Sequence, residues 1–226
     1  MKVAVVKYNA GNIRSVDYAL KRLGVEAVIT ADKEELQSAD KVIFPGVGEA
    51  ETTMNHLKAT GLDELIKNLR QPVLGICLGM QIMTIEFARN VLGYRDANSS
   101  EFDLTTKYPV ISIMEEQKNV VEKGGTMRLG AWKCQLKPNT TLFEIYGAKN
   151  ITERHRHRYE FNSEFLEDFE NNGLQASGVN PDTKLVETVE LKNHPFYVGV
   201  QYHPEYKSTV ATPHPLFIAL IKAASK

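Results

Sequence analysis

A cysteine lies between two glycines directly after a short apolar segment. The run Val73–Ile76 has the composition of a buried strand, Cys77 follows it, and a helical pattern extends from Met80 to Arg89. A sharp strand-to-helix turn, with glycines leaving room beside its apex, presents the side chain at the apex as a nucleophile. A helix N-terminus also favours the thiolate. The segment predicts a reactive cysteine; the alternative is an ordinary core cysteine in a turn.

A nucleophilic cysteine needs a base, and one of the six histidines has suitable surroundings. His203 follows the apolar run Tyr197–Tyr202, and Pro204 and Glu205 come directly after it. The proline stiffens the bend, so that the carboxylate can turn back to the imidazole, set its tautomer and stabilise the imidazolium. We therefore predict a triad of Cys77, His203 and Glu205. The alternative is a surface His-Pro turn with a solvated glutamate.

Strand and helix patterns alternate through the first ninety residues, which favours βαβ units. Such units form a parallel sheet with helices on both faces, and the carboxyl ends of the strands meet at one ligand-binding edge. The fold class is therefore α/β with a mostly parallel central sheet. The strands are expected at Lys2–Tyr8, Val25–Ile29, Lys41–Phe44 and Val73–Ile76, and the helices near Ile13–Leu23, Ala50–Lys58 and Leu62–Asn68.

The second half of the chain is richer in short β-type runs, which predicts a β-rich flank on the parallel sheet. We expect residues 1–226 to form one domain, since no repeat or flexible linker interrupts them. The predicted strands are Val110–Ile113, Gly130–Leu136, Leu174–Val179, Leu185–Leu191 and Tyr197–Tyr202, with helices at Glu164–Asn171 and Pro215–Ala224.

Composition excludes several classes of protein. The net charge of -1 provides no basic field for nucleic acid or an anionic membrane, and no apolar run approaches the length of a membrane span. The apolar stretch at the N-terminus is too short for a signal peptide. Two cysteines, Cys77 and Cys134, cannot make a disulfide framework, and a reducing compartment would keep a reactive thiol free. We therefore expect a cytoplasmic location, with no nucleic-acid or membrane partner.

The two motifs together resemble those of the class I, triad-type glutamine amidotransferases. They are Gly75–Gln81 (GICLGMQ) and Gln201–Glu205 (QYHPE), and the resemblance covers nearly the whole chain. It implies a flavodoxin-like fold and no metal or cofactor. It also implies that Cys77 attacks the carboxamide of glutamine to form a glutamyl thioester and free ammonia, and that water then hydrolyses the thioester with His203 as base.

The same resemblance assigns residues to the oxyanion and to the substrate. The N–H of Leu78 points into the space beside the sulfur, and Pro45–Gly48 matches the family's oxyanion strand, so Gly46 and Val47 would hold the developing charge with it. A glutamine zwitterion needs both a carboxylate and a guanidinium. The resemblance implies three substrate-binding residues: Glu101 for the ammonium, Arg158 for the carboxylate, and Gln81 lining the pocket.

The two parts of the chain resemble two different amidotransferases. Residues 1–81 resemble the glutaminase subunit of imidazole-glycerol-phosphate synthase, through Tyr8–Val16 and Phe44–Gly48. Residues 84–226 resemble the glutaminase domain of CTP synthase; the carriers are Ile85–Asn90, Ser100–Asp103, Gly124–Gly130 and Glu153–Asn162. The ammonia acceptor would be a cyclase subunit of histidine biosynthesis or a synthetase domain of pyrimidine biosynthesis.

Our hypothesis for this division is a constructed hybrid, and a natural free-standing relative is the alternative. A full-length natural sequence that runs unbroken through residues 70–95 would contradict the hybrid.

The basic run from Arg154 to Arg158 allows several interpretations. As a strand it places its arginines on one face and His155 and His157 on the other. Without interleaved aromatic residues or a wider basic field it is a poor nucleic-acid footprint. A metal site at His155, His157 and His203 lacks supporting ligands, so we favour a solvated or interface-facing strand. Trp132 and Cys134 are expected to be packing residues.

Two other functions are compatible with the same motifs. A cysteine peptidase or deglycase could use a similar sheet, but Gln81, Glu101 and Arg158 would recognise a free amino acid and not a peptide. A folded hybrid with a misaligned triad could serve only as a scaffold. Ammonia release from glutamine separates the leading hypothesis from both.

Overall fold

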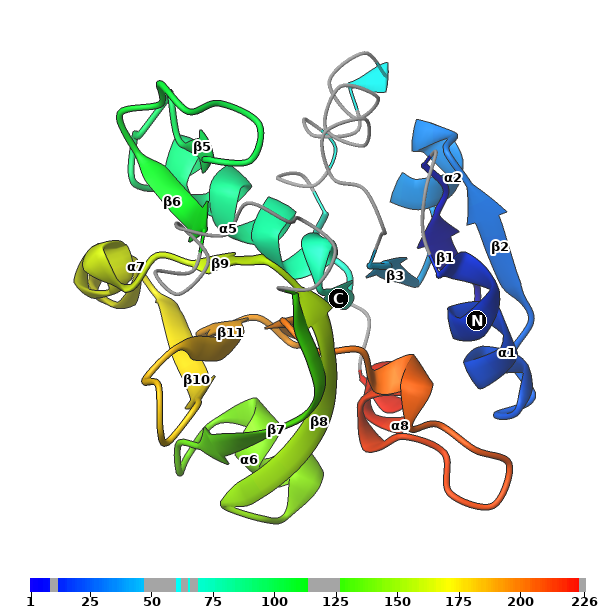
Figure 1. The fold of residues 1–226 in the computed structure, drawn as a ribbon. Helices are drawn as coiled ribbons and strands as arrows, with labels where there is room; N and C mark the ends of the chain where they lie inside the picture. Colours follow the sequence, from blue (N-terminus) through cyan, green and yellow to red (C-terminus); the bar gives the residue numbers. More distant parts are fainter. Residues whose placement is uncertain (9–11, 47–59, 62–64, 66–68, 114–126, 224–226) are drawn as a thin grey trace.

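The chain forms an α/β structure built on one large mixed sheet (Figure 1). This computed structural model describes residues 1–8, 12–46, 60–61, 65, 69–113 and 127–223. The order of the nine strands in the sheet is β2-β1-β3-β4-β12-β11-β10-β7-β8. The predicted fold class, a mostly parallel sheet with helices on both faces and a β-rich flank, is confirmed.

The first five strands of this order run parallel to one another. Their residues are mainly valine, isoleucine and alanine, and β1, β3 and β4 are buried along their whole length, as expected of parallel strands covered on both faces. Their carboxyl ends therefore lie at one edge. The five strands are β2 (Ala27–Thr30), β1 (Val3–Val6), β3 (Lys41–Phe44), β4 (Val73–Ile76) and β12 (Tyr197–Val200).

Helices cover both faces of the parallel strands, as the alternation of side chains in β1 demonstrates. Val3 and Val5 belong to the same core cluster as buried residues of α1 (Ile13–Lys21), α6 (Thr141–Tyr146) and α8 (Pro215–Lys222). Ala4 and Val6 pack instead with residues of α2 (Lys33–Gln37) and α5 (Leu78–Asn90). Figure 1 shows α5 between the β1–β3 region and the β-rich flank. Since α5 follows β4 directly, its N-terminus lies at the edge where the parallel strands end.

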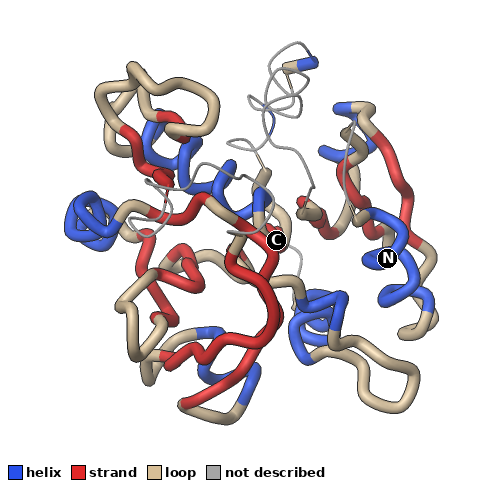
Figure 2. Tube along the Cα trace, in the orientation of Figure 1, coloured by secondary structure: helices blue, strands red, loops and turns tan. Residues whose placement is uncertain are grey.

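The flank continues the sheet with four antiparallel strands. The longest of them, β7 and β8, lie side by side as an antiparallel pair (Figure 2). A separate three-stranded sheet and α7 (Leu166–Asn171) pack beside this flank. The flank strands are β11 (Val186–Leu191), β10 (Leu174–Val179), β7 (Arg128–Leu136) and β8 (Asn150–His157), and the small sheet holds β5 (Asn98–Ser99), β6 (Pro109–Ile113) and β9 (Tyr159–Phe161).

Most differences from the predicted elements lie at their ends. The strand predicted to reach Tyr202 ends at Val200, because the backbone turns there toward a short 3-10 helix, Pro204–Tyr206. The predicted helices Ala50–Lys58 and Leu62–Asn68 lie outside the described residues, apart from isolated positions. In the part of the chain that the structure describes, no helix is long and apolar enough to cross a membrane.

Two short helices, α2 and α6, were not predicted. In each, the preceding residue caps the first turn: Asp32 accepts a hydrogen bond from the Glu35 N–H at 2.9 Å, and Thr140 accepts one from the Phe143 N–H at 3.1 Å. A capping residue followed by an acidic residue in the first turn was therefore the available sequence signal.

Candidate active site

Cys77 occupies a strained turn between β4 and α5. Its backbone has φ 51° and ψ -107°, in a region that residues other than glycine rarely adopt. A hydrogen bond from its N–H to the Val200 carbonyl, at 2.7 Å, fixes the turn against β12. Strain of this kind persists only where the surrounding structure holds it, and it occurs often at functional sites. The predicted elbow geometry is therefore present.

The two glycines that flank Cys77 are required by packing. A Cβ atom on Gly75 would lie 2.8 Å from the carbonyl carbon of Gly79, and one on Gly79 would lie 2.8 Å from the Cβ of Phe44. The first turn of α5 thus lies directly against β4 and the end of β3. Larger residues at either position would push the helix, and the sulfur with it, away from the sheet.

His203 and Glu205 form a buried pair beside this turn. The imidazole Nδ1 lies 2.7 Å from the Glu205 carboxylate, and both side chains are almost fully buried. Burial by itself would lower the pKa of His203, but the Cys77 sulfur and the Glu205 carboxylate together raise it to about 11. The ring of Tyr206 stacks on the imidazole with a centroid distance of 4.8 Å. This environment favours the imidazolium.

Gly46 lies between the cysteine and the histidine. A Cβ atom placed on Gly46 would be 2.6 Å from His203 Cε1 and 2.9 Å from Cys77 Cβ. The loop after β3 therefore contacts both side chains, which lie close to each other. The structure thus brings together all three residues of the predicted triad.

The N-terminal segment secures the Glu205 carboxylate and the Gly46 loop. The amide of Asn12 donates to Glu205 Oε1 at 3.2 Å, and the Asn12 N–H donates to the Gly46 carbonyl at 3.2 Å. Ser15 donates to the Asn12 side-chain oxygen at 2.6 Å, which orients the amide. The Tyr8 hydroxyl donates to the Pro45 carbonyl. The sequence analysis named Tyr8–Val16 only as a motif that carries the resemblance, and it gave neither Asn12 nor Tyr8 a role in the site.

Replacing Asn12 with alanine is expected to lower kcat/KM about tenfold for the glutamine hydrolysis that the resemblance implies. The variant loses a hydrogen bond to a charged group, which contributes about 1.5–3 kcal/mol, and leaves the carboxylate less well oriented. Steady-state ammonia release measures the effect. Ser15→Ala, which only loosens the amide, is the control and should lose less activity. Equal activity of Asn12→Ala and wild type would contradict the assignment.

The structure describes five of the six residues that were predicted to bind the oxyanion or the substrate. Leu78 is the first residue of α5, where helix N–H groups lack intrahelical partners, and Val47 lies outside the described residues. Burial raises the pKa of Tyr159, the nearby Glu101 carboxylate raises it further, and Arg158 lowers it. Glu101 and Arg158 therefore both lie close enough to the Tyr159 hydroxyl to affect its pKa, and both are half-buried.

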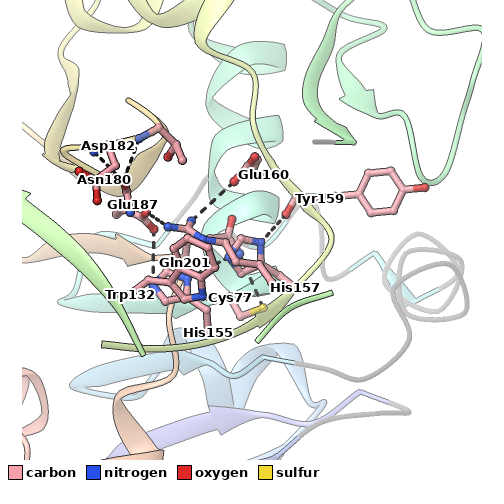
Figure 3. A network of polar contacts seen from close by, with 12 residues as sticks. Cys77, Trp132, His155, His157, Tyr159, Glu160, Asn180, Asp182, Glu187 and Gln201 are labelled. Carbon is pink, nitrogen blue, oxygen red and sulfur yellow. Dashed lines mark hydrogen bonds and ion pairs between the residues drawn. The ribbon is translucent and has the colours of Figure 1, made fainter. Parts of the chain in front are cut away.

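A buried network of polar side chains extends from Cys77 into the flank (Figure 3). His157 Nδ1 bonds the Tyr159 carbonyl at 3.1 Å, and its Nε2 bonds His155 Nδ1 at 2.9 Å. His155 faces Glu187 at 3.6 Å, and Glu187 accepts from Arg128 at 2.5 Å. The predicted alternation is confirmed within β8, where Arg154 and Arg156 are exposed and His155 and His157 are buried, whereas Arg158 follows the strand and is half-buried. Among the described residues, no group of three or more potential metal ligands is arranged to hold an ion.

The two buried histidines are expected to make the protein less stable in acid. Burial lowers the pKa of His157 to about 3, and it lowers that of His155 further, whereas an unfolded histidine titrates near 6.5. The unfolded chain therefore binds more protons below pH 6.5. Each histidine should remove about 1.4 kcal/mol of unfolding free energy per pH unit in that range.

Urea unfolding at pH 7.5, 6.5 and 5.5 measures this dependence. His157→Gln should have a shallower decline than wild type. Parallel curves for the two proteins would contradict the prediction.

The fold and this site define an α/β protein with a cysteine at a nucleophile elbow beside a histidine–glutamate pair. A family model described as glutamine amidotransferase class-I matches residues 4–223, and the chain belongs to this family. It is a class I glutamine amidotransferase.

The proteins to which this chain is similar include two curated CTP synthases and a solved glutaminase domain. CTP synthase from Flavobacterium johnsoniae is 55% identical over 202 residues, covering 87% of this chain and 36% of that protein. CTP synthase from Christiangramia forsetii is 61% identical over 153 residues, covering 68% of this chain and 28% of that protein. The glutaminase domain of Trypanosoma brucei CTPS with bound acivicin matches with a TM-score of 0.84 and 31% identity, covering 98% of this chain and 92% of that one. The chain spans about a third of the length of these curated relatives.

Proposed function

We propose that this chain hydrolyses L-glutamine to glutamate and ammonia through Cys77, His203 and Glu205. The observation that carries the proposal is the meeting of these side chains at the carboxyl ends of β4 and β12, with Gly46 between them. A buried imidazolium beside the sulfur, with Nδ1 held by a carboxylate, suits a thiolate nucleophile.

In the proposed reaction, the Cys77 thiolate attacks the side-chain carboxamide carbon of glutamine. Backbone N–H groups of Gly46, Val47 and Leu78 hold the oxyanion, and His203 Nε2–H protonates the leaving nitrogen, which departs as ammonia. His203 then takes a proton from water, which attacks the glutamyl thioester and releases glutamate and the thiolate. Glu205 keeps the imidazole in one orientation throughout.

We propose that Glu101 binds the substrate ammonium and Arg158 its carboxylate, with Gln81 beside the pocket. The shared influence of Glu101 and Arg158 on Tyr159 supports their proximity. The assay is ammonia release from free L-glutamine compared with a peptide that contains an internal glutamine. Equimolar ammonia and glutamate from the free amino acid alone would support the proposal. Cleavage of the peptide backbone, detected as new amino termini without ammonia, would favour a peptidase.

We propose the synthetase domain of a CTP synthase as the ammonia acceptor, because the relatives described above carry that name. The cyclase subunit of imidazole-glycerol-phosphate synthase is the second candidate, on the motifs of residues 8–16 and 44–48. The alignment with CTP synthase from Flavobacterium johnsoniae covers 87% of this chain and therefore extends across residues 70–95, which argues against a hybrid origin.

Glutaminase rates with each acceptor added separately test the choice between them. Stimulation by the synthetase portion alone supports the first candidate, and stimulation by the cyclase alone supports the second. A cytoplasmic location completes the proposal, since both cysteines are free and Cys77 must stay reduced.

A further inference from the structure

Gln201 is placed beside the Cys77 sulfur by the register of two parallel strands. Val200 of β12 pairs with Ile76 of β4, so the next residue of each strand, Gln201 and Cys77, leaves the sheet side by side. The backbone N–H of Gln201 bonds the Glu187 carbonyl at 2.8 Å. Its side chain is fully buried, and its Nε2 lies 3.7 Å from Cys77 Sγ. The contact is therefore built by the sheet and not by a loose surface side chain.

The orientation of the Gln201 amide follows from a chain of hydrogen bonds. The Tyr159 carbonyl can only accept, so the Gln81 group that contacts it at 2.7 Å must be the NH₂. The same nitrogen contacts the Gln201 amide at 3.2 Å, and that contact must be with the Gln201 oxygen. Gln201 consequently turns its own NH₂ toward the sulfur. Figure 3 shows Gln201 and Cys77 close together within this network.

The groups around the sulfur favour different protonation states. The Arg156 carbonyl, 3.9 Å from Sγ, can accept only from a thiol. The Gln201 N–H and the His203 imidazolium stabilise a thiolate, since hydrogen bonds to an ionised acceptor are stronger than those to a neutral one. Burial raises the pKa of the Tyr8 hydroxyl, and the nearby Cys77 and Glu205 raise it further. Without the Gln201 amide donor, the Arg156 carbonyl would remain beside the sulfur and would favour the thiol.

We propose that Gln201 is a further catalytic residue, whose side-chain N–H donates to the Cys77 sulfur and stabilises the thiolate, and that Gln81 is a positioning residue that holds the Gln201 amide in this orientation. The inference rests on the proposed role of Cys77 as nucleophile. It gives Gln81 a role that its burial and its two hydrogen bonds support, in addition to lining a substrate pocket.

The test measures alkylation of Cys77 by iodoacetamide as a function of pH, without glutamine, with the modified peptide identified by mass spectrometry. Gln201→Glu keeps the side-chain size and the oxygen that accepts from Gln81, but loses the donor to sulfur. Its alkylation midpoint should move upward by at least one pH unit, which makes alkylation about tenfold slower at neutral pH. Gln81→Leu should shift the midpoint in the same direction by a smaller amount.

Two further variants keep the test decisive. Gln201→Leu removes the donor without adding a charge, and it decides the matter if the buried carboxylate of Gln201→Glu prevents folding. Gln135→Glu, in β7 and bonded to Asn150, is the matched control and should keep the wild-type midpoint. Folded Gln201→Leu with the wild-type midpoint would overturn the proposal.

The readout also separates this inference from the proposed function. An upward shift in a protein that does not hydrolyse glutamine would support the inference and contradict the proposed function. Hydrolysis by wild type with no shift in any Gln201 variant would do the reverse.

Discussion

Replacing Cys77 with alanine is expected to reduce ammonia release from glutamine by a factor on the order of a thousand or more. Without the sulfur no glutamyl thioester can form, and the remaining site could only orient water. The fold should be retained, because alanine accepts the same backbone strain at φ 51° as cysteine does. Coupled detection of glutamate and ammonia measures the loss, and thermal unfolding checks the fold.

Cys134→Ala provides the matched control for this substitution. Cys134 is the other cysteine; it is 1% exposed and belongs to a core cluster, as the sequence predicted for a packing residue. Its replacement should cost about 1 kcal/mol of stability and leave glutamine hydrolysis near the wild-type rate. Equal ammonia from wild type and Cys77→Ala would contradict the assignment of the nucleophile, whatever the control does.

The parallel half of the sheet could be predicted because its strands are buried on both faces. Lys41–Phe44 and Val73–Ile76 coincide with β3 and β4, since an uninterrupted apolar run between turn residues leaves few alternatives. Strand β8 was harder, because its charged and imidazole side chains resemble an exposed run. His155 and His157 can be buried there because they bond each other, the Tyr159 carbonyl and Glu187, and of these partners only Glu187 comes from a distant part of the chain.

The triad followed from residue types and local spacing, whereas its supporting residues depend on strand order. Glu205 is two residues from His203, so their pairing is nearly local. Gln201 meets Cys77 only because β12 pairs with β4, and Asn12 meets Glu205 only because the loops after β1 and β12 reach the same edge. Alternating helices and strands predict a parallel sheet but do not specify this order of strands.

Replacing Gly46 with alanine is expected to lower kcat for glutamine hydrolysis at least about a hundredfold. The new Cβ would lie 2.6 Å from His203 Cε1 and 2.9 Å from Cys77 Cβ, closer than real atoms approach. Cys77 Cβ is held by the strained turn and cannot yield, so the imidazole must move. Displacement by about 1 Å is enough for such a loss, since catalysis depends on near-attack geometry.

Gly46→Ala keeps its backbone N–H, so its effect isolates crowding of the cysteine and histidine from loss of an oxyanion donor. Gly24→Ala is the control: its Cβ would meet nothing within 4 Å, and it carries only the strain of φ +72°. Steady-state kinetics with both variants, after thermal unfolding has confirmed their folds, measures the difference. A folded Gly46→Ala with kcat within about threefold of wild type would contradict this prediction. It would mean that catalysis does not depend on the observed positions of Cys77 and His203, although the proposed role of the imidazole as acid and base requires such a dependence.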